Sequence, residues 1–541
     1  MTDPDEAAHG TMTLWELAVD RAGRSPDGVL AISDDGSEIT FSELADRALG
    51  AAAWLARHGV VAGKSVAWQL PTGIDAIIVA VALSRLGAIQ VPILPFLGTR
   101  ELGHVLAQTG AMVLVVRPGW GQGDHDHYDY VVKNFESVRV VQLGFELEGA
   151  NDDAAPAGPT APAAAPTAPA AAPTAPAADR RAPPAPPAPP GTHSWVFYTS
   201  GTTAAPKGAR HSDATLSACA RAMVDRYDVT PADRIAFVFQ ITHIGGISWI
   251  YGALMSGCAL LLVEKFNREA TWFLRRHGVT LAGAGLPFLL EYLAAQRTLP
   301  AGERLFPAVR AFTSGGMPKP PSIHYEIKRE CGGAGVLSGY GMTEAPVVVA
   351  AGFALSDEEL AHSEGSPMPG VELRIVGGDG EPVAPGEVGE LRLKAPQVML
   401  GYLDAALDAE AFDEAGFLRT GDLGRLDPDG NLIVTGRLKD VIIRKGENVS
   451  AKEVEDVLFT HPDIREVAVV GLPDAVRGEL VCAVIVSDDA AVDVSRVAEF
   501  LTERGLMRQK IPERVEMVDA LPRTGFGKVD KKELRRRYSE A

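Results

Sequence analysis

The stretch Tyr-Thr-Ser-Gly-Thr-Thr-Ala-Ala-Pro-Lys-Gly, residues 198–208, carries the strongest signal in the chain. It follows Ser-Trp-Val-Phe at residues 194–197, an aromatic and β-branched run that predicts a strand. Small residues let a backbone approach a ligand closely, so N–H groups and hydroxyls can surround phosphate oxygens while the lysine supplies charge. A plain surface loop is the alternative, but the order of strand, small-residue loop and lysine favours phosphate binding.

Length, composition and charge indicate an ordinary globular protein with more than one domain. The chain has 541 residues, of which 46% are apolar and 22% charged, and a chain of this length needs more than one core. Its net charge of −19 argues against nucleic acid or an anionic membrane surface as the main partner. A locally basic site can still bind an anionic small molecule. The sequence leaves a homodimer open.

The four cysteines, Cys219, Cys258, Cys331 and Cys482, form no closely spaced pair. This spacing indicates reduced thiols in a cytosolic protein and no structural zinc. The acidic residues 1–6 lack the apolar run of a signal peptide, so we expect a cytoplasmic location.

The uncharged segment 244–263 is long enough to span a bilayer, but glycines interrupt it. We expect instead a buried helix that ends at Gly257 and a buried strand over residues 259–263. The sequence therefore predicts no membrane span.

Helical and strand patterns alternate over residues 12–149, which predicts an α/β body with largely parallel sheets. A helix is expected over residues 41–58, with Ser42 as its cap. A second helix is expected over residues 74–86, and strands over residues 65–70, 89–94, 112–116 and 138–143. Residues 59–65 resemble a Walker A loop but are one residue short and lead into a strand, so we interpret them as an ordinary loop.

An almost pure alanine and proline segment interrupts this pattern within residues 150–191. The sequence Pro-Thr-Ala-Pro-Ala-Ala-Ala occurs from Pro159 and again from Pro166. Prolines this frequent forbid a helix, and without bulky apolar side chains the segment cannot offset the entropy lost on ordering. We expect a disordered or polyproline-like insertion with no chemistry of its own.

The α/β pattern resumes after residue 191 and becomes richer in strands toward residue 436. Strands are expected over residues 234–239, 309–313, 371–376, 389–394 and 432–435, and a helix over residues 288–296.

A compact second unit is expected from residue 437 onward. Ser450 and Glu453 have the spacing of a capping box at the start of a helix. Strands over residues 466–470 and 481–486 and a helix over residues 494–501 complete a small α/β unit. We therefore expect an α/β protein with a large multi-sheet N-terminal body, residues 1–436, and a small mobile C-terminal α+β domain, residues 437–541.

Five polar clusters bracketed by glycines follow the first loop. They are Ser-Gly-Gly-Met-Pro at 314–318, Gly-Tyr-Gly-Met-Thr-Glu at 339–344, Arg-Thr-Gly-Asp at 419–422, Gly-Arg-Leu-Lys-Asp at 436–440 and Pro-Arg-Thr-Gly-Phe-Gly-Lys at 522–528. Each alone could be an ordinary turn. Together they offer a phosphate cradle, an aromatic face for a base, carboxylates for a metal and a ribose, and cations.

These clusters, in this order and spacing, resemble the core motifs of the acyl-activating (AMP-forming) adenylate synthetase superfamily, and most closely its acyl-CoA synthetase branch. The resemblance covers nearly the whole chain apart from the alanine and proline segment. It implies a two-step reaction with ATP, Mg²⁺ and CoA, in which a small-molecule carboxylic acid attacks the α-phosphate and a thiol then attacks the acyl-adenylate. The C-terminal domain is expected to rotate between the two steps.

The resemblance also implies residue roles. Tyr340 would lie against adenine, Thr343 would bind phosphate and Glu344 would ligate Mg²⁺. Lys528 would bridge the substrate carboxylate and the α-phosphate. His243 falls where the family places an aromatic residue or a histidine beside the acyl pocket, although a core histidine is an equal alternative. The remaining nucleotide-binding residues implied are Thr199, Ser200, Gly201, Thr202, Thr203, Lys207, Gly315, Gly339, Gly341, Asp422 and Arg437.

Two further positions bear on the thiol step. Lys439 matches the position of the family's hinge. Lys445, Gly446 and Glu447 match the loop that lines the thiol tunnel, where the family usually has two glycines and this chain has Lys445 and Gly446. The lysine either narrows the tunnel or meets a phosphate of CoA.

Three functions remain in competition. An acyl-CoA synthetase for a medium-chain, alicyclic or steroid-derived acid is favoured. An acyl-AMP ligase that loads a carrier protein is the alternative, and an inactive nucleotide-binding scaffold is the remote one. No nucleophile elbow or activated cysteine competes with them, and Lys207, Glu344, Asp422, Arg437 and Lys528 are all present, which argues against the scaffold.

Overall fold

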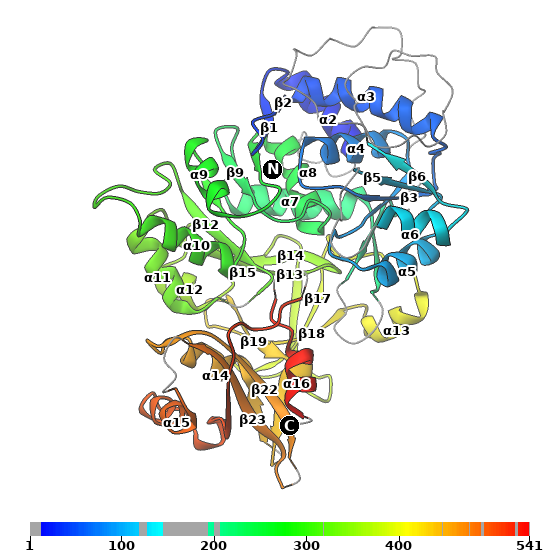
Figure 1. The fold of residues 1–541 in the computed structure, drawn as a ribbon. Coiled ribbons are helices and arrows are strands. Elements are labelled where there is room, and N and C mark those ends of the chain that lie inside the picture. Colours follow the sequence, from blue (N-terminus) through cyan, green and yellow to red (C-terminus); the bar gives the residue numbers. More distant parts are fainter. Residues whose placement is uncertain are drawn as a thin grey trace.

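The computed structural model describes residues 12–117, 127–143, 193–199, 206–317, 319–445, 447–474, 476–487, 492–524 and 528–539. The alanine and proline segment expected within residues 150–191 lies outside the described residues. In Figure 1 the C-terminal unit, coloured orange to red, lies below a larger body.

Two largely parallel sheets form the body, as the sequence predicts. In the first sheet, the central strands pair in parallel, and antiparallel strands lie at both edges. Its order within the described residues is β15 (Ser366–Pro367), β14 (Ala345–Ala350), β13 (Val336–Met342), β12 (Ala311–Gly315), β11 (Leu281–Ala282), β9 (Arg234–Phe237), β10 (Ala259–Leu262), β1 (Val29–Ser33) and β2 (Glu38–Thr40).

The second sheet is parallel except for its last pair, β7 and β8. Its order is β6 (Arg139–Gln142), β5 (Val113–Val116), β3 (Ser65–Gln69), β4 (Ile89–Pro92), β7 (Trp195–Tyr198) and β8 (Gly208–His211). Residues 59–65, which resemble a Walker A loop, lead into β3 as an ordinary loop.

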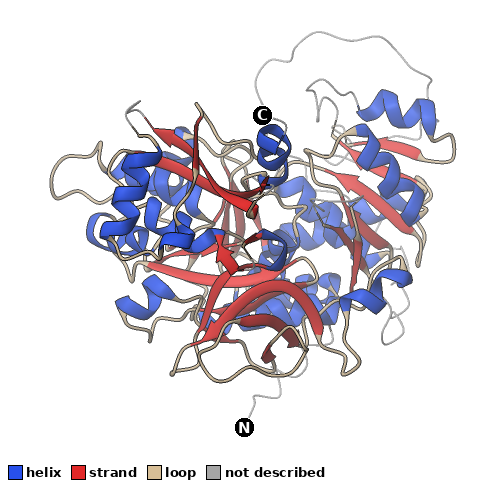
Figure 2. Ribbon diagram, turned by 90° about the horizontal axis from the view of Figure 1, so that it is seen from below, coloured by secondary structure: helices blue, strands red, loops and turns tan. Residues whose placement is uncertain are grey.

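Helices fill the space between the two sheets and cover their outer faces (Figure 2). The largest apolar cluster joins residues of both sheets to α2 (Leu14–Arg24), α3 (Phe41–Arg57), α4 (Ile74–Arg85), α7 (Asp213–Arg226) and α8 (Ile244–Ser256). A second cluster packs the outer face of the first sheet against α9 (Arg268–Arg276), α10 (Leu286–Gln296) and α11 (Pro321–Glu330). A third packs α5 (Thr99–Thr109) and α6 (His127–Asn134) on the second sheet. The body therefore has five alternating layers of helix and sheet.

An antiparallel sheet follows, with the order β16 (Glu372–Val376), β17 (Gly389–Lys394), β18 (Leu418–Leu426) and β19 (Leu432–Arg437). Along the chain, the short helix α12 (Asp357–His362) precedes this sheet, and α13 (Asp408–Ala411) comes between β17 and β18. Its apolar face packs on Tyr340, Ala345 and Val348 of the first sheet. The strand-rich region predicted toward residue 436 is thus confirmed.

The C-terminal unit is built on β21 (Glu447–Ser450), β20 (Val441–Arg444), β23 (Gly478–Ser487), β22 (Ile464–Asp474) and β24 (Arg514–Met517). The helices α14 (Ala451–Leu458) and α15 (Val494–Glu503) pack on one face, and α16 (Lys531–Ser539) packs on the other. An α/β fold with a large multi-sheet body and a smaller C-terminal domain is confirmed.

Two helix caps differ from the sequence prediction. Thr40, not Ser42, caps α3, because Thr40 and Glu43 form the reciprocal capping box while the Ser42 hydroxyl donates to the carbonyl of Pro26. Ser450 caps α14 as expected, but its hydroxyl donates to the Thr435 carbonyl and the Glu453 carboxylate pairs with Lys510. A tertiary partner replaces the second half of the predicted capping box.

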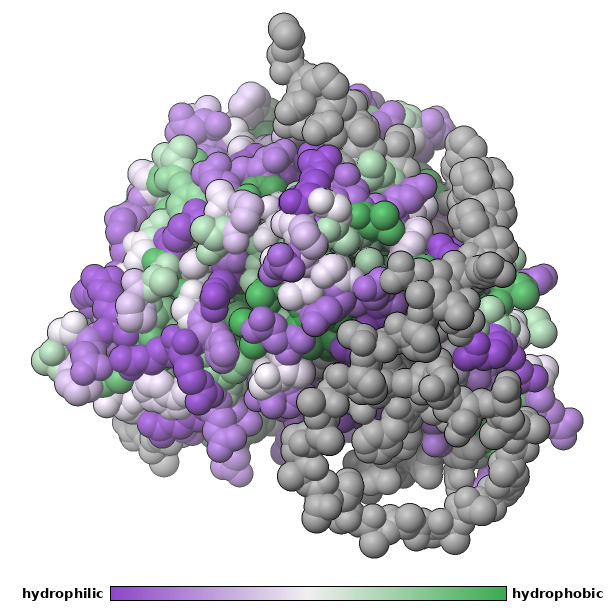
Figure 3. All heavy atoms as spheres, turned by 90° about the horizontal axis from the view of Figure 1, so that it is seen from above, coloured by the Kyte–Doolittle hydropathy of each residue, from purple (hydrophilic) through white to green (hydrophobic). Residues whose placement is uncertain are grey.

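As predicted, the segment 244–263 folds into a buried helix followed by a buried strand. It forms α8, a left-handed C-cap at Gly257, and the buried strand β10. Within the described residues, no helix is long and apolar enough to cross a membrane. On the face seen in Figure 3, apolar residues are scattered among polar ones outside the grey atoms.

Candidate active site

The glycine clusters meet at the carboxyl ends of neighbouring strands. Gly315 is the last residue of β12 and lies in register with Gly339 on the parallel strand β13. Ligands of open α/β sheets bind outside the carboxyl ends of the strands, where helix and loop connections diverge. A Cβ atom at Gly315 would lie 3.3 Å from the Gly339 carbonyl oxygen, so the two strands pack closely beside Tyr340.

Gly341 is required by the hairpin that joins β13 to β14. A Cβ atom at this position would lie only 2.3 Å from the backbone nitrogen of Val347, so any larger residue would force the strands apart. The register shifts between Tyr340 and Met342, which marks a bulge. This local geometry turns the chain so that Thr343 and Glu344 stand at the tip between the strands.

Asp422, on β18 of the antiparallel sheet, contacts Tyr340 on β13 of the first sheet. It is 4% exposed, accepts a hydrogen bond of 2.8 Å from the Tyr340 hydroxyl, and lies 2.7 Å from Nε of Arg437. Burial and the Asp422 charge raise the pKa of Tyr340 well above its ordinary value, so the phenol stays protonated and acts as a donor. The structure therefore brings Tyr340, Asp422 and Arg437 together, and their roles toward a nucleotide stay predictions.

Glu344 is 7% exposed and is held by a residue that the sequence analysis missed. The Tyr402 hydroxyl donates to Oε1 of Glu344 at 2.6 Å. Nζ of Lys207 lies 5.3 Å from the centroid of the same tyrosine ring. No sequence pattern singles out Tyr402, because its partners are remote along the chain.

The two ends of the predicted phosphate-binding loop, Thr199 and Lys207, lie side by side next to the paired strands β7 and β8. The Thr199 N–H donates to the Lys207 carbonyl at 3.0 Å, which fixes both ends of the loop. The predicted residues Ser200, Gly201, Thr202 and Thr203 lie outside the described residues.

His211, on β8, is a second residue that the sequence analysis missed. Its Nε2 lies 2.9 Å from the Thr343 carbonyl and its Nδ1 lies 3.1 Å from the Thr215 hydroxyl. Complete burial lowers the pKa of His211 to about 4, so the imidazole is neutral at pH 7 and Nε2–H donates to the carbonyl. No sequence pattern singles out His211, because its strand reads Gly-Ala-Arg-His. His211 ties the turn that carries Glu344 to the strand after Lys207.

Lys528 reaches this cluster from the C-terminal unit. The red chain leading into α16 runs toward β17 and β18 of the body (Figure 1). Burial, together with the charges of Arg437 and Lys439, lowers the pKa of Lys528 to about 8, and the charges of Asp422 and Glu344 act in the opposite direction.

His243 caps α8 and lies close enough to Lys528 to sense its charge. Its Nδ1 accepts the Gly245 N–H at 3.1 Å, which leaves the imidazole proton on Nε2. Burial, followed by the Lys528 charge, lowers the pKa of His243 to about 4. The histidine is therefore neutral at pH 7, and its place beside an acyl pocket stays a prediction.

The predicted hinge and thiol-side loop lie beyond this cluster. Lys439 lies in a single 3₁₀ turn, Leu438–Asp440, between β19 and β20. Lys445 begins the two-residue turn between β20 and β21 with a φ of 51°, the left-handed region that favours glycine. Lys445 and Glu447 are exposed, and among the described residues neither donates a hydrogen bond to Tyr340, Glu344 or Asp422. Gly446 lies outside the described residues.

A metal site made of protein ligands alone is absent from the described part of the chain, where no three His, Cys, Asp or Glu side chains gather. Glu344 nevertheless suits Mg²⁺, since this ion is usually held by one or two carboxylates together with substrate phosphates and water. Tyr402 donates to one carboxylate oxygen, and the other has no hydrogen-bond partner among the residues that the structure describes.

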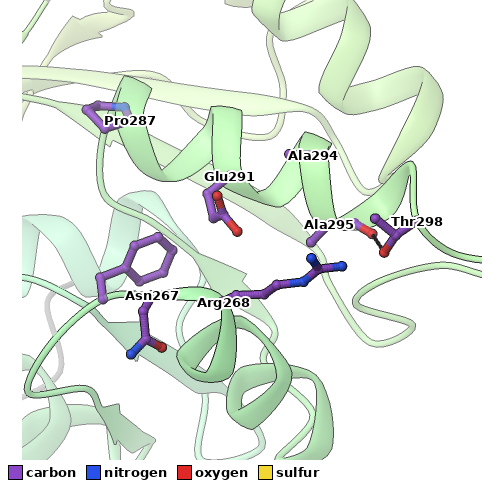
Figure 4. A pocket seen from close by; sticks show the side chains of 8 residues that line it. Asn267, Arg268, Pro287, Glu291, Ala294, Ala295 and Thr298 are labelled. Carbon is purple, nitrogen blue, oxygen red and sulfur yellow. Dashed lines mark hydrogen bonds between the residues drawn. The ribbon is translucent and has the colours of Figure 1, made fainter. Parts of the chain in front are cut away.

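A groove of about 550 Å³ lies elsewhere, between the start of α9 and one face of α10 (Figure 4). Phe266, Arg268 and Glu291 are among the side chains that line it. None of its lining residues belongs to the cluster described above, so the groove has no part in the candidate site.

The comparison with family models agrees with this geometry. Residues 19–403 match the model of the AMP-binding enzymes, and residues 453–528 match the model of their C-terminal domain. The chain belongs to the AMP-binding enzyme family. It is thus an adenylate-forming ligase, a class of enzymes that use ATP.

The names of relatives in the AMP-binding enzyme family specify different acyl acceptors, a carrier protein in one case and CoA in another. The chain is 34% identical to salicyl-AMP ligase / salicyl-S-ArCP synthetase of Mycobacterium tuberculosis, over 98% of this chain and 91% of the relative. It is 28% identical to medium-chain fatty-acid–CoA ligase of Escherichia coli, over 97% and 90% of the two chains. Among solved structures, ATP-bound MatB from Rhodopseudomonas palustris superposes with a TM-score of 0.83 at 26% identity, covering 98% of this chain and 99% of MatB.

Proposed function

We propose that this protein activates a carboxylic acid as its acyl-adenylate and transfers the acyl group to the thiol of CoA. The observation that supports this most is the meeting of Lys528 with Asp422, Arg437 and Glu344, since charges from both units of the chain act at one place. Adenylation brings two anions together, a carboxylate and a triphosphate. Positioning and charge neutralisation are therefore the main catalytic requirements.

In the first step, a carboxylate oxygen of the acid attacks the α-phosphorus, and the bond to the β-phosphate oxygen breaks to release pyrophosphate. The Lys528 ammonium lies between the two reacting anions and neutralises charge that grows in the transition state. Lys207 and the loop that begins at Thr199 hold the β- and γ-phosphates. Mg²⁺, held by Glu344 and the phosphate oxygens, supplies further positive charge when bound.

Nucleotide recognition is assigned to the residues around β13. Tyr340 lies against adenine and, through its hydroxyl, fixes Asp422. Asp422 accepts the ribose hydroxyls, and Arg437 orients its carboxylate. Thr343 binds phosphate, and the backbone at Gly315, Gly339 and Gly341 borders the nucleotide. Neutral His243 faces the acid from the start of α8.

In the second step, the thiol sulfur attacks the acyl carbon, the thiol proton is lost, and AMP leaves. We assign residues 437–541 to a mobile domain that turns about Lys439 so that Lys528 withdraws and the loop at Lys445–Glu447 approaches. A medium-chain, alicyclic or steroid-derived acid is the substrate class that the chain's motifs favour.

A carrier protein is the second candidate acceptor. The identity of 34% with the salicyl-AMP ligase, whose name includes a carrier protein, exceeds the 28% with the medium-chain CoA ligase, and this difference favours it. In that case a protein-bound phosphopantetheine thiol would take the place of CoA in the second step.

The deciding experiment is acid-dependent exchange of labelled pyrophosphate into ATP across a panel of aliphatic, alicyclic, aromatic and steroid-derived acids. The best acid is then tested with CoA and with carrier proteins, and thioester formation is followed by mass spectrometry. Exchange with at least one acid is expected, followed by formation of its CoA thioester. Exchange without CoA thioester but with carrier loading would assign the second candidate, and absence of exchange with every acid would contradict both.

A further inference from the structure

Tyr402 contacts two oppositely charged residues of the site at once. It is 5% exposed, its hydroxyl donates to Oε1 of Glu344 at 2.6 Å, and its ring centroid lies 5.3 Å from Nζ of Lys207. Burial, and then the Glu344 charge, raises the pKa of Tyr402 far above neutrality. The side chain is therefore a fixed neutral donor with an aromatic face.

The backbone around Tyr402 is anchored to the same two parts of the site. The Met399 N–H donates to the Glu344 carbonyl at 2.8 Å, and the Leu400 N–H donates to the Arg210 carbonyl at 2.8 Å. The Leu403 N–H donates to the Gly208 carbonyl, also at 2.8 Å, one residue beyond Lys207. The position of the Tyr402 ring is thus fixed relative to both charged side chains.

Lys207 and Glu344 would weaken each other as ligands if they formed an ion pair. Both residues are described, and no ion pair joins them. The hydroxyl of Tyr402 satisfies one oxygen of the carboxylate, and its ring attracts the ammonium through a cation–π interaction. Among the described residues, neither the second carboxylate oxygen nor the ammonium has a further hydrogen bond or ion pair, so the two groups can bind a cation and phosphate.

We propose that Tyr402 is a positioning residue that holds the Lys207 ammonium and the Glu344 carboxylate apart and oriented toward a metal-bound triphosphate. This assignment rests on the proposed function, because it concerns the same nucleotide site. Tyr402 touches neither reacting atom. It acts through the two charged groups that flank it.

The test is metal and nucleotide binding without turnover. Tyr402→Phe removes the hydroxyl and keeps the ring, so its affinity for Mn²⁺ in the presence of α,β-methylene-ATP isolates the bond to Glu344. Electron paramagnetic resonance should show a dissociation constant for Mn²⁺ about tenfold higher than in the wild type, which is the size expected for one hydrogen bond to a charged group. The KM for the acid should stay unchanged.

Tyr325→Phe is the matched control. Tyr325 is exposed, and its hydroxyl donates to Oε2 of Glu358 at 2.8 Å, so the same kind of bond is lost outside the site. This variant should bind Mn²⁺ as the wild type does. Equal losses in the two variants would assign the effect to general stability and overturn the proposal.

Two further variants separate the two contacts of Tyr402. In a Glu344→Gln background, adding Tyr402→Phe should cause little further loss of Mn²⁺ affinity, since the hydroxyl acts through the carboxylate. Tyr402→Leu also removes the ring, so metal-free binding of α,β-methylene-ATP in EDTA should weaken several-fold beyond Tyr402→Phe.

The outcomes distinguish this proposal from the proposed function. Wild-type Mn²⁺ affinity in Tyr402→Phe, or unchanged metal-free nucleotide binding in Tyr402→Leu, would overturn the role of Tyr402 alone. A wild-type protein that binds the metal–nucleotide complex but exchanges pyrophosphate with no acid would contradict the proposed function alone. Should Tyr402→Phe not fold, the comparison of Tyr402→Leu with wild type in EDTA still decides whether the ring acts on Lys207.

Discussion

Arg437 and Asp422 face each other in register across β18 and β19, with Nε of the arginine 2.7 Å from Oδ1 of the aspartate. Arg437 is the last residue of β19, and the next residues, Leu438–Asp440, form the single turn that leads into the C-terminal unit. The carboxylate assigned to the ribose is therefore held by the residue from which the C-terminal unit departs. Any rotation of that unit begins one turn away from the nucleotide.

Lys528 is expected to serve adenylation and little else. Replacing it with alanine removes a positive charge that acts on the reacting anions, so adenylate formation should fall by orders of magnitude, roughly 10² to 10³. Thioester formation from a synthetic acyl-adenylate should persist, because in the proposed second step Lys528 has withdrawn from the reacting groups. The two half-reactions are measured separately by pyrophosphate exchange and by thiol consumption, and equal loss of both would contradict this division of labour.

Adenylation should decline as the pH rises through about 8. The pKa of Lys528 is lowered to about 8, so the ammonium is mostly charged at pH 7 and loses its proton above pH 8. Because kcat/KM reports the free enzyme, its logarithm for ATP should fall on the alkaline side with an apparent pKa near 8. Lys528→Arg is the control, since a guanidinium stays charged in this range. An alkaline limb that is the same in both proteins would assign the titration to another group.

Lys439→Pro should separate the two steps. Proline fixes φ near −65°, which is compatible with the 3₁₀ turn that Lys439 occupies in the present arrangement. The variant should therefore keep pyrophosphate exchange and lose thioester formation, while Lys439→Ala should keep both. Thioester production by a folded Lys439→Pro protein at the wild-type rate would rule out rotation about this residue.

Deletion of residues 154–182, closed by a short Gly/Ser link, should change little. The described residues on either side are anchored independently, since the Leu143 N–H donates to the Val116 carbonyl and the Gln90 N–H donates to the Ser194 carbonyl. Shortening a long connection changes its closure entropy by well under about 1 kcal/mol. Melting temperature and turnover should stay near wild-type values, and a large fall in either would mean that the segment packs on the protein or binds a partner.

The sequence by itself determined features that depend on neighbouring residues. Periodicity and local backbone preference predict the strand that precedes residue 199 and the buried helix that ends at Gly257. The described structure contains both elements. The close approach at Gly341 likewise requires glycine, whatever the rest of the chain does. The alternating pattern was sufficient to indicate the α/β body, and the resemblance of the glycine clusters to known motifs implied the family and the Tyr340, Glu344 and Asp422 set.

Only the tertiary structure decided which distant groups meet. Thr40 rather than Ser42 caps α3, and Glu453 pairs with Lys510 in place of closing its own capping box. The contacts of Tyr402 with Glu344 and Lys207, and the approach of Lys528 to Asp422, join segments far apart in the sequence. Hydrogen bonds and charge contacts act over a few ångströms, so they arise where sheets and domains dock, and no local pattern encodes that docking.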